Sequence, residues 1–335
     1  MKSHSLKALV SAVALAVAGS ASAALINPDG TGSDTATNVG ALDWNAGNVL
    51  VTPVTGSVTS PAVGDTFQTF AQASLSAFND PNGTKIGANF SNFNNGLYEW
   101  TYISAFQETV TAVTGSGGTG SATFVTAAGG TNYFSIYYDP TPDSNSLAGT
   151  GFGPDATDTD SVLVLQGTVL PFNPITLIGD TTFGATGVNQ VNPALDQFGI
   201  NNYPNVTSIS GNGSGDFAVQ TTFVNAAYFP GGVPSVFLVN FTSQISLPFL
   251  TQDPSSCMNN GLGGVQDAVG PNTAGGPCTV NTVGPINGIS GPNEILFADA
   301  TTTFTPQAVP EPASLALLGV GLGALGFVIR RRSKT

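Results

Sequence analysis

The chain has 335 residues, of which only 8% are charged, with 20 acidic and 7 basic side chains. Residues 24–308 hold every acidic residue except Glu311 and a single basic residue, Lys85, so 19 negative charges and one positive charge leave a net charge of −18. A nucleic-acid-binding protein needs clustered lysine or arginine to displace counterions from phosphates, which excludes that class. The only histidine is His4. Catalysis by Ser-His-Asp or Cys-His groups and histidine-ligated metals are therefore excluded from residues 24–308.

The first 23 residues have the three parts of a secretory signal peptide. Lys2 and Lys7 form a basic segment, and residues 8–18 form an apolar segment that is too short to span a bilayer stably. Ala21-Ser22-Ala23 places small residues where a signal peptidase cuts. We expect cleavage between Ala23 and Ala24.

Residues 309–335 combine a short motif, an apolar segment and a basic end. The motif consists of Val309, Pro310, Glu311 and Pro312. Its two prolines keep a helix from starting earlier. Residues 313–329 are uncharged and mostly apolar, and at a 1.5 Å rise they extend for roughly 25 Å, so we expect a short transmembrane helix. The basic end, residues 330–335, contains Arg330, Arg331 and Arg332, which should hold it in the cytoplasm and leave residues 24–308 outside.

This order of motif, helix and arginines resembles the tail of the PEP-CTERM family of bacterial surface proteins. The string that carries the resemblance is VPEPASLALLGVGLGALGFVIRRR, residues 309–332. The resemblance implies processing by an exosortase that recognises Pro310, Glu311 and Pro312. It also implies a precursor anchored in the inner membrane of a Gram-negative bacterium, which later reaches the cell surface or the extracellular matrix. A permanent membrane anchor is the alternative.

The region between the two ends, residues 24–308, is typical of β-structure, because Gly, Thr, Asn and Ser are abundant and helix-forming residues are scarce. Apolar residues alternate with polar ones in several segments, as in half-buried strands. These apolar positions are Tyr98, Trp100, Tyr102 and Phe106; Phe134, Ile136 and Tyr138; Phe217, Val219 and Phe223; and Phe237, Val239, Phe241, Ile245 and Leu247. Residues 161–170 contain the apolar run VLVL of a buried strand. We therefore expect an all-β fold, either an antiparallel β-sandwich or a jelly-roll-like body, with long loops rich in Gly, Asn and Thr.

Two features bear on how this region is organised. The glycine-rich stretch Gly115–Ser121 is either a linker between two domains or the loop of a long hairpin. Cys257 and Cys278 are the only cysteines, and export to an oxidising compartment favours a disulfide between them. Closing that loop would stabilise the fold by about 3 kcal/mol.

Glu99 and Glu108 are the first carboxylate pair to consider for glycoside hydrolysis. If they share one continuous strand, nine steps of about 3.3 Å separate them by roughly 30 Å, and the odd spacing places them on opposite faces. Glycosidase pairs need roughly 5 to 10 Å. We therefore identify no catalytic residue and expect a protein that is not an enzyme.

Five aspartates gather within a short glycine-rich stretch: Asp139, Asp143, Asp155, Asp158 and Asp160. Asp155, Asp158 and Asp160 are the closest in sequence, and clustered carboxylates suit a hard cation such as calcium, which takes six to eight oxygens. The spacing is not that of an EF-hand, and no other cofactor is indicated. The alternative is a solvated turn in which aspartate is simply a turn-forming residue.

Further segments look like those of flocculation-associated PEP-CTERM proteins. They are residues 41–48 (ALDWNAGN), 97–101 (LYEWT), 137–140 (YYDP) and 149–152 (GTGF). This second resemblance implies a surface or matrix protein that helps cells aggregate within exopolysaccharide, and it supplies no catalytic residues. A secreted carbohydrate-binding module and a polysaccharide-active enzyme are the alternatives.

Overall fold

Most of the described residues of the protein lie in β-strands. The computed structural model describes residues 23–58, 60–116, 119–146, 149–155, 158–171, 174–181, 211–247, 258–259, 268–269 and 294–304. In this part the main strands are β3 (Ala41–Trp44), β4 (Gly47–Pro53), β5 (Thr66–Asn79), β6 (Glu99–Ser116), β7 (Thr119–Ala127), β8 (Tyr133–Asp139), β9 (Val162–Val169), β10 (Pro174–Thr181), β11 (Gly211–Val224), β12 (Val236–Leu247) and β15 (Glu294–Thr303). The expectation of an all-β fold is confirmed.

Short elements complete the described structure. They are β1 (Ala24–Ile26), β2 (Thr37–Val39), β13 (Met258–Asn259), β14 (Ala268–Val269), the 3₁₀ helix η1 (Ala88–Phe90) and the α-helix α2 (Ser91–Asn94). β1 pairs with β2 and β13 pairs with β14, each as a separate two-stranded sheet. None of the helices in the described part is long and apolar enough to cross a membrane.

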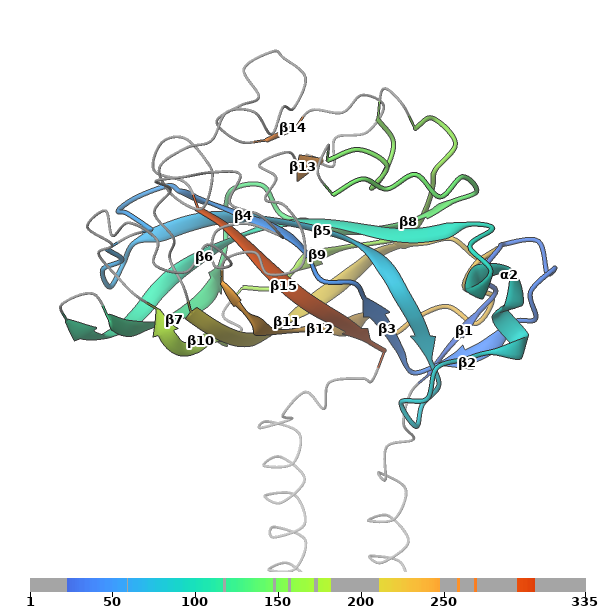
Figure 1. Ribbon diagram of the computed structural model, residues 1–335, viewed down its shortest axis with the longest axis horizontal. Helices are drawn as coiled ribbons and strands as arrows, with labels where there is room; N and C mark the ends of the chain where they lie inside the picture. Colours follow the sequence, from blue (N-terminus) through green and yellow to red (C-terminus); the bar gives the residue numbers. More distant parts are fainter. Residues whose placement is uncertain are drawn as a thin grey trace, which may run out of the picture. The chain divides into compact units, whose positions relative to one another are not determined.

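The eleven main strands form a single antiparallel sheet that closes on itself where β5 pairs with β6. The order is β10-β7-β6-β8-β9-β11-β12-β15-β3-β5-β4, with additional pairings of β6 with β5 and of β15 with β4. Residues 67–72 of β5 pair with β4 at one edge while residues 66–74 pair with β6 at the other. We call the resulting ring of strands, from β5 and β6 round to β15, β3 and β4, the closed sheet. In Figure 1, β5 and β8 run along its upper side and β11 and β12 along its lower side. The upper and lower strands thus belong to one sheet and not to the two separate sheets of a sandwich.

The main hydrophobic core fills the inner face of the closed sheet. It draws side chains from strands all around the ring, among them Trp44, Phe67, Trp100, Phe134 and Phe237, each at most 2% exposed. Trp100, Tyr102 and Phe106 of β6 all lie in this core, and so does Tyr98 just before the strand, as the alternation predicts.

Phe223 is an exception to the predicted alternation. Phe217 and Val219 on the same strand β11 are buried, but the pairing of β11 with β9 shifts by one residue between Thr221 and Phe223. A bulge of this kind reverses the face to which the following residues point. Phe223 is accordingly 42% exposed.

A second, smaller core lies on the opposite face of the same strands. It contains Leu50, Phe70, Ile103, Tyr137 and Phe297. Phe152, from the loop after β8, and Met258 of β13 belong to the same cluster and are each 1% exposed. The loop after β8 is therefore packed onto the outside of the sheet.

The glycine-rich stretch 115–121 lies at the end of the β6–β7 hairpin. Gly115 pairs with Gly120 and Ser116 with Thr119, so the two strands stay hydrogen-bonded almost to the turn. β15, near the end of the described chain, pairs with β12 along one side and with β3 and β4 along the other.

Candidate functional site

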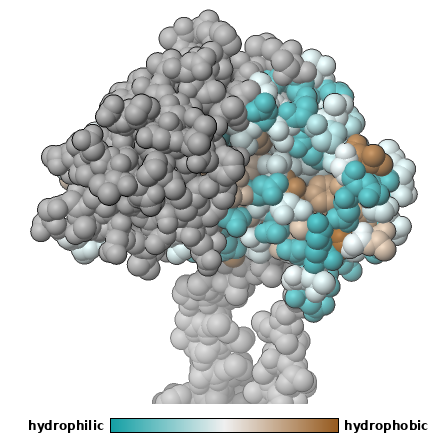
Figure 2. Space-filling model, in the orientation of Figure 1, coloured by the Kyte–Doolittle hydropathy of each residue, from teal (hydrophilic) through white to brown (hydrophobic). Residues whose placement is uncertain are grey.

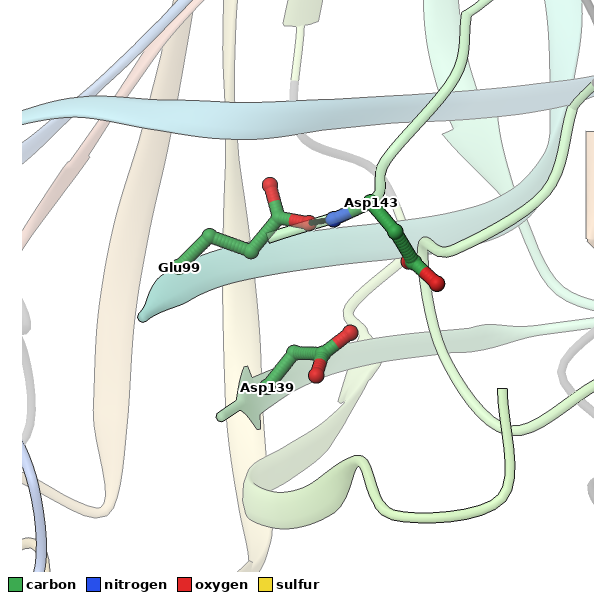
Figure 3. Close-up of side chains that lie close together, drawn as sticks. All are labelled: Glu99, Asp139 and Asp143. Carbon is green, nitrogen blue, oxygen red and sulfur yellow. Dashed lines mark hydrogen bonds between the residues drawn. The ribbon is translucent and has the colours of Figure 1, made fainter. Parts of the chain in front are cut away.

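An acidic cluster forms where β6 begins and β8 ends. The two strands are antiparallel, so Glu99, the first residue of β6, lies directly opposite Asp139, the last residue of β8. Figure 3 shows Glu99 and Asp139 on these neighbouring strands, with Asp143 above them on the loop that follows β8. Directly opposed like charges destabilise a strand pair unless something neutralises them.

Glu99 fastens the loop that follows β8. Its Oε1 accepts hydrogen bonds from the backbone N–H groups of Asp143 and Ser144, both at 2.7 Å, and its Oε2 accepts one from the Ser144 hydroxyl at 2.6 Å. Burial raises the pKa of Glu99, and these hydrogen bonds act in the opposite direction. Further along the loop, the Thr101 hydroxyl donates to the Phe152 carbonyl at 3.0 Å. The loop is thus tied to β6 at two places.

Asp139 is the most enclosed carboxylate of the cluster. Its side chain is 0% exposed, and Oδ1 accepts a hydrogen bond of 2.7 Å from the Thr141 N–H. The other oxygen, Oδ2, is buried, and no donor among the described residues reaches it. The pKa of Asp139 is raised to about 7, mainly by burial and also by repulsion from the carboxylates of Asp158, Asp143 and Glu99, against the opposing Thr141 hydrogen bond. An oxygen that is both buried and unpaired is unusual in a folded protein.

Two groups of three carboxylates meet at Asp139. The first consists of Glu99, Asp139 and Asp143, and the second of Asp139, Asp158 and Asp160. In each group one oxygen from every member lies within 4.8 Å of the others. Asp143 and Asp160 are exposed, whereas Asp139 and Asp158 are buried. The cluster therefore reaches from the buried end of β8 to the surface of the loop.

Asp155, which the sequence places with Asp158 and Asp160, belongs to neither group of the described residues. Its Oδ2 accepts a hydrogen bond from the Gly151 N–H at 3.0 Å and its Oδ1 one from the Asp158 N–H at 2.9 Å. Asp155 thus shapes the turn that presents Asp158 and Asp160. The structure brings Asp158 and Asp160 together with Asp139, a member of the predicted set of five.

Asp158 also stabilises the turn. Its Oδ1 accepts hydrogen bonds from the Ser161 N–H at 3.0 Å and the Asp160 N–H at 3.3 Å, and its Oδ2 accepts one from the Ser161 hydroxyl. Thr141, which binds Asp139 through its N–H, also donates its hydroxyl to Asp160 Oδ2 at 3.4 Å. The carboxylates are accordingly fixed in place by the backbone around them.

A second buried aspartate shows what a structural carboxylate looks like in this fold. Asp34 is 1% exposed, and its Oδ2 accepts hydrogen bonds from the Tyr98 hydroxyl at 2.7 Å and the Phe93 N–H at 3.4 Å. Its Oδ1 accepts one from the Asn92 N–H at 3.1 Å. Both oxygens of Asp34 are therefore paired within the protein, whereas Oδ2 of Asp139 has no donor among the described residues.

The carboxylate pair Glu99 and Glu108 lies on one continuous strand, as the sequence indicates. Glu108 pairs with Phe67 and lies on the core side of β6, whereas Glu99 faces the loop. Glu108 is 6% exposed and accepts a hydrogen bond of 2.7 Å from the Thr69 hydroxyl. The two carboxylates are on opposite faces and form no joint site.

Several residues predicted from the sequence lie outside the described residues. They are the motif Val309, Pro310, Glu311 and Pro312, the arginines Arg330, Arg331 and Arg332, the expected helix 313–329, and the cysteines Cys257 and Cys278. At the expected signal-peptide cleavage site, Ala24 is the first residue of β1 and pairs with Val39.

Comparison with known proteins identifies one short segment of the chain. A search of curated proteins gave no match, and neither did a search of solved structures. A family model, the PEP-CTERM protein-sorting motif, matches residues 308–332. This match supports an exported protein that an exosortase processes and that reaches the surface of a Gram-negative bacterium. The chain therefore carries a PEP-CTERM protein-sorting motif that follows its β-sheet region in the sequence.

Proposed function

We propose that the chain is a non-enzymatic protein of the cell surface or extracellular matrix that promotes cell aggregation in association with exopolysaccharide. The observation that carries this proposal is the sorting motif at residues 308–332, because it directs the β-sheet region to the outside of the cell. Attachment and cohesion between cells take place there.

The four segments that resemble flocculation-associated proteins converge on the acidic cluster, which supports the proposal. Glu99 lies in the second segment and Asp139 in the third. The first segment reaches the loop through Asn48, whose side chain donates to the Ser146 carbonyl at 2.7 Å. The fourth segment is held through the bond from Thr101 to Phe152. All four segments thus belong to, or are hydrogen-bonded to, β6, β8 or the loop that carries the acidic cluster.

The coloured part of the face drawn in Figure 2 is suited to polar rather than apolar contacts. On the face drawn in Figure 2, the coloured surface is mostly hydrophilic, and hydrophobic residues occur in small separate groups. With a net charge of −18 between residues 24 and 308, copies of the protein repel one another and repel anionic polymers at low salt. Cohesion with an acidic polysaccharide would therefore depend on divalent cations between carboxylates, which makes aggregation sensitive to chelators.

A gene deletion with complementation tests this function. In the deletion strain, aggregates should settle more slowly than in the parent, and the full chain should restore settling. A variant carrying Pro310→Ala, Glu311→Ala and Pro312→Ala should not restore it, whereas the control Ser314→Ala, two residues beyond Pro312, should. Settling of the deletion strain at the parental rate would contradict the proposal.

A further inference from the structure

We propose that the acidic cluster of Glu99, Asp139, Asp143, Asp158 and Asp160 is a calcium-binding site in which Asp139 is the ligand shared by both carboxylate groups. The site stands on the geometry of the cluster and does not depend on a role in cell aggregation. A bound ion would balance the charge of the clustered carboxylates and would engage the buried Asp139 oxygen that lacks a donor among the described residues.

The first argument is charge. Five carboxylates gather at this site. The one basic residue between residues 24 and 308 is Lys85, and its charge interacts with Asp43, where it lowers the pKa against the effect of burial. A bound divalent cation would supply the missing positive charge.

The second argument is the buried oxygen of Asp139. The Asp139 side chain is 0% exposed and its Oδ2 lacks a donor among the described residues, although the polar backbone of the loop satisfies its Oδ1. Figure 3 shows the Asp139 carboxylate pointing toward Asp143, which lies on the loop that follows β8. A metal ion accepts a lone pair from such an oxygen without a hydrogen-bond donor. Asp34, equally buried, has donors on both oxygens and needs no ion.

The third argument is the size of the cluster. Oxygens on opposite sides of a calcium ion are separated by about twice the Ca–O distance of 2.3 to 2.6 Å, or roughly 4.6 to 5.2 Å. Each group has its oxygens within 4.8 Å of one another, which fits inside that span. Magnesium binds at about 2.0 to 2.1 Å and demands a near-ideal octahedron, whereas calcium accepts the irregular set of oxygens that two strands and a loop provide. The donor set of carboxylates also suits a hard cation.

The consequence of binding would be a fixed loop. The ion would join β6 and β8 to the loop between residues 140 and 161. This loop also carries Phe152, which packs in the second, smaller core. Extracellular calcium modules bind with dissociation constants of about 0.1 to 1 mM. We expect an affinity in that range, which matches the surroundings of an exported protein.

Calorimetry of the full chain tests the site. The chain is purified in a mild detergent, stripped with EDTA, freed of the chelator and titrated with calcium chloride or, separately, with magnesium chloride. Saturable calcium binding, a higher melting temperature with calcium and slower proteolysis within residues 140–161 are expected. The affinity for magnesium should be at least about tenfold lower than the affinity for calcium.

Substitutions then assign the site to Asp139. Asp139→Asn should weaken calcium binding by about tenfold or more. The matched control is Asp216→Asn, which removes the same charge from an exposed position on β11 and should change the affinity by less than about twofold. Because Asp139 is buried and Asp139→Asn can disturb folding, the double variant of the exposed Asp143→Asn and Asp160→Asn provides a second reading. It should also lose about tenfold.

Two results would overturn the site. One is the absence of saturable calcium binding by the stripped chain. The other is binding of calcium by folded Asp139→Asn, or by the folded double variant, as tightly as by the unchanged protein. Neither result bears on cell aggregation, which the settling assay measures separately.

Discussion

Glu99 and Asp139 are directly opposed on neighbouring antiparallel strands, and both carboxylates face the loop that follows β8. Glu99 is paired with donors from that loop through both oxygens, whereas Asp139 is paired through one. The two residues therefore have different roles, since Glu99 fastens the loop and Asp139 completes the carboxylate groups.

Replacing Glu99 should separate its hydrogen-bonding role from its charge. Glu99→Ala removes the acceptor for the backbone N–H groups of Asp143 and Ser144 and for the Ser144 hydroxyl. It should lower the free energy of unfolding by about 2 kcal/mol. Glu99→Gln keeps an acceptor oxygen and relieves one like charge, so its loss should be less than half as large. Urea unfolding of the two variants measures the difference. Equal losses would show that the charge, and not the hydrogen bonds, holds the loop.

Glu108 should make stability depend on pH. Burial raises its pKa to about 7 in the folded protein, against the opposing Thr69 hydrogen bond, while in the unfolded chain it ionises near its ordinary value of about 4.3. Between about pH 4.5 and 7 the unfolded state loses this proton and the folded state keeps it, so stability falls as pH rises and levels off above pH 7. The full difference is about 4 kcal/mol.

The variant Glu108→Gln isolates this contribution. Relative to the unchanged protein it should gain about 3 kcal/mol between pH 4 and pH 8, because the amide does not ionise. Denaturant unfolding at several pH values measures it, with Asp216→Asn as the exposed control. A difference between variant and parent that stays constant with pH would contradict the buried, protonated glutamate.

A buried hydrogen bond ties β3 to β15. The indole N–H of Trp44 donates to the Thr302 hydroxyl at 2.9 Å, and both side chains are at most 1% exposed. Thr302→Val keeps the shape but leaves the N–H without an acceptor, at a cost of about 1 to 3 kcal/mol. Adding Trp44→Phe should then cost less than it does in the parent, because the unpaired donor is gone. A double-mutant cycle from urea unfolding measures this coupling, and strict additivity would contradict it.

Gly167 lies where β9 and β11 approach too closely for a side chain. A Cβ at this position would come within 2.4 Å of Val219 Cγ1 and 2.6 Å of the Gln220 carbonyl oxygen. Gly167→Ala should therefore destabilise the fold by about 2 to 3 kcal/mol. The control is Gly231→Ala, where the nearest atom would lie at 3.4 Å, an ordinary contact, so the melting temperature should hardly change. Similar melting temperatures for the two variants would show that β9 can move away.

The strands that sequence alone predicts are those with one face in the core and regular pairing. On β6 the aromatic residues Trp100, Tyr102 and Phe106 alternate, and the structure places them in the main core. β5 has no such alternation, because Phe67 faces the inner core and Phe70 the outer one, so apolar residues occur on both faces. The closure of the sheet between β5 and β6 joins residues whose proximity depends on the whole topology.

The candidate site was predictable in its composition and not in its geometry. Asp139, Asp143, Asp158 and Asp160 are close in sequence, and the structure brings them together. Asp155 is equally close in sequence, but its carboxylate accepts two backbone N–H groups of the turn. Glu99 joins the cluster through the register of β6 against β8, about 40 residues away along the chain, and no spacing in the sequence signals that pairing.

The place of β15 in the sheet has a mechanical consequence. Any pull that reaches the folded region through the C-terminal segment arrives at this strand, which is hydrogen-bonded to β12 along one side and to β3 and β4 along the other. A force along the strand loads these bonds in parallel rather than one after another. A cell held by this tail in flowing water would therefore load a strand that is paired along both of its sides.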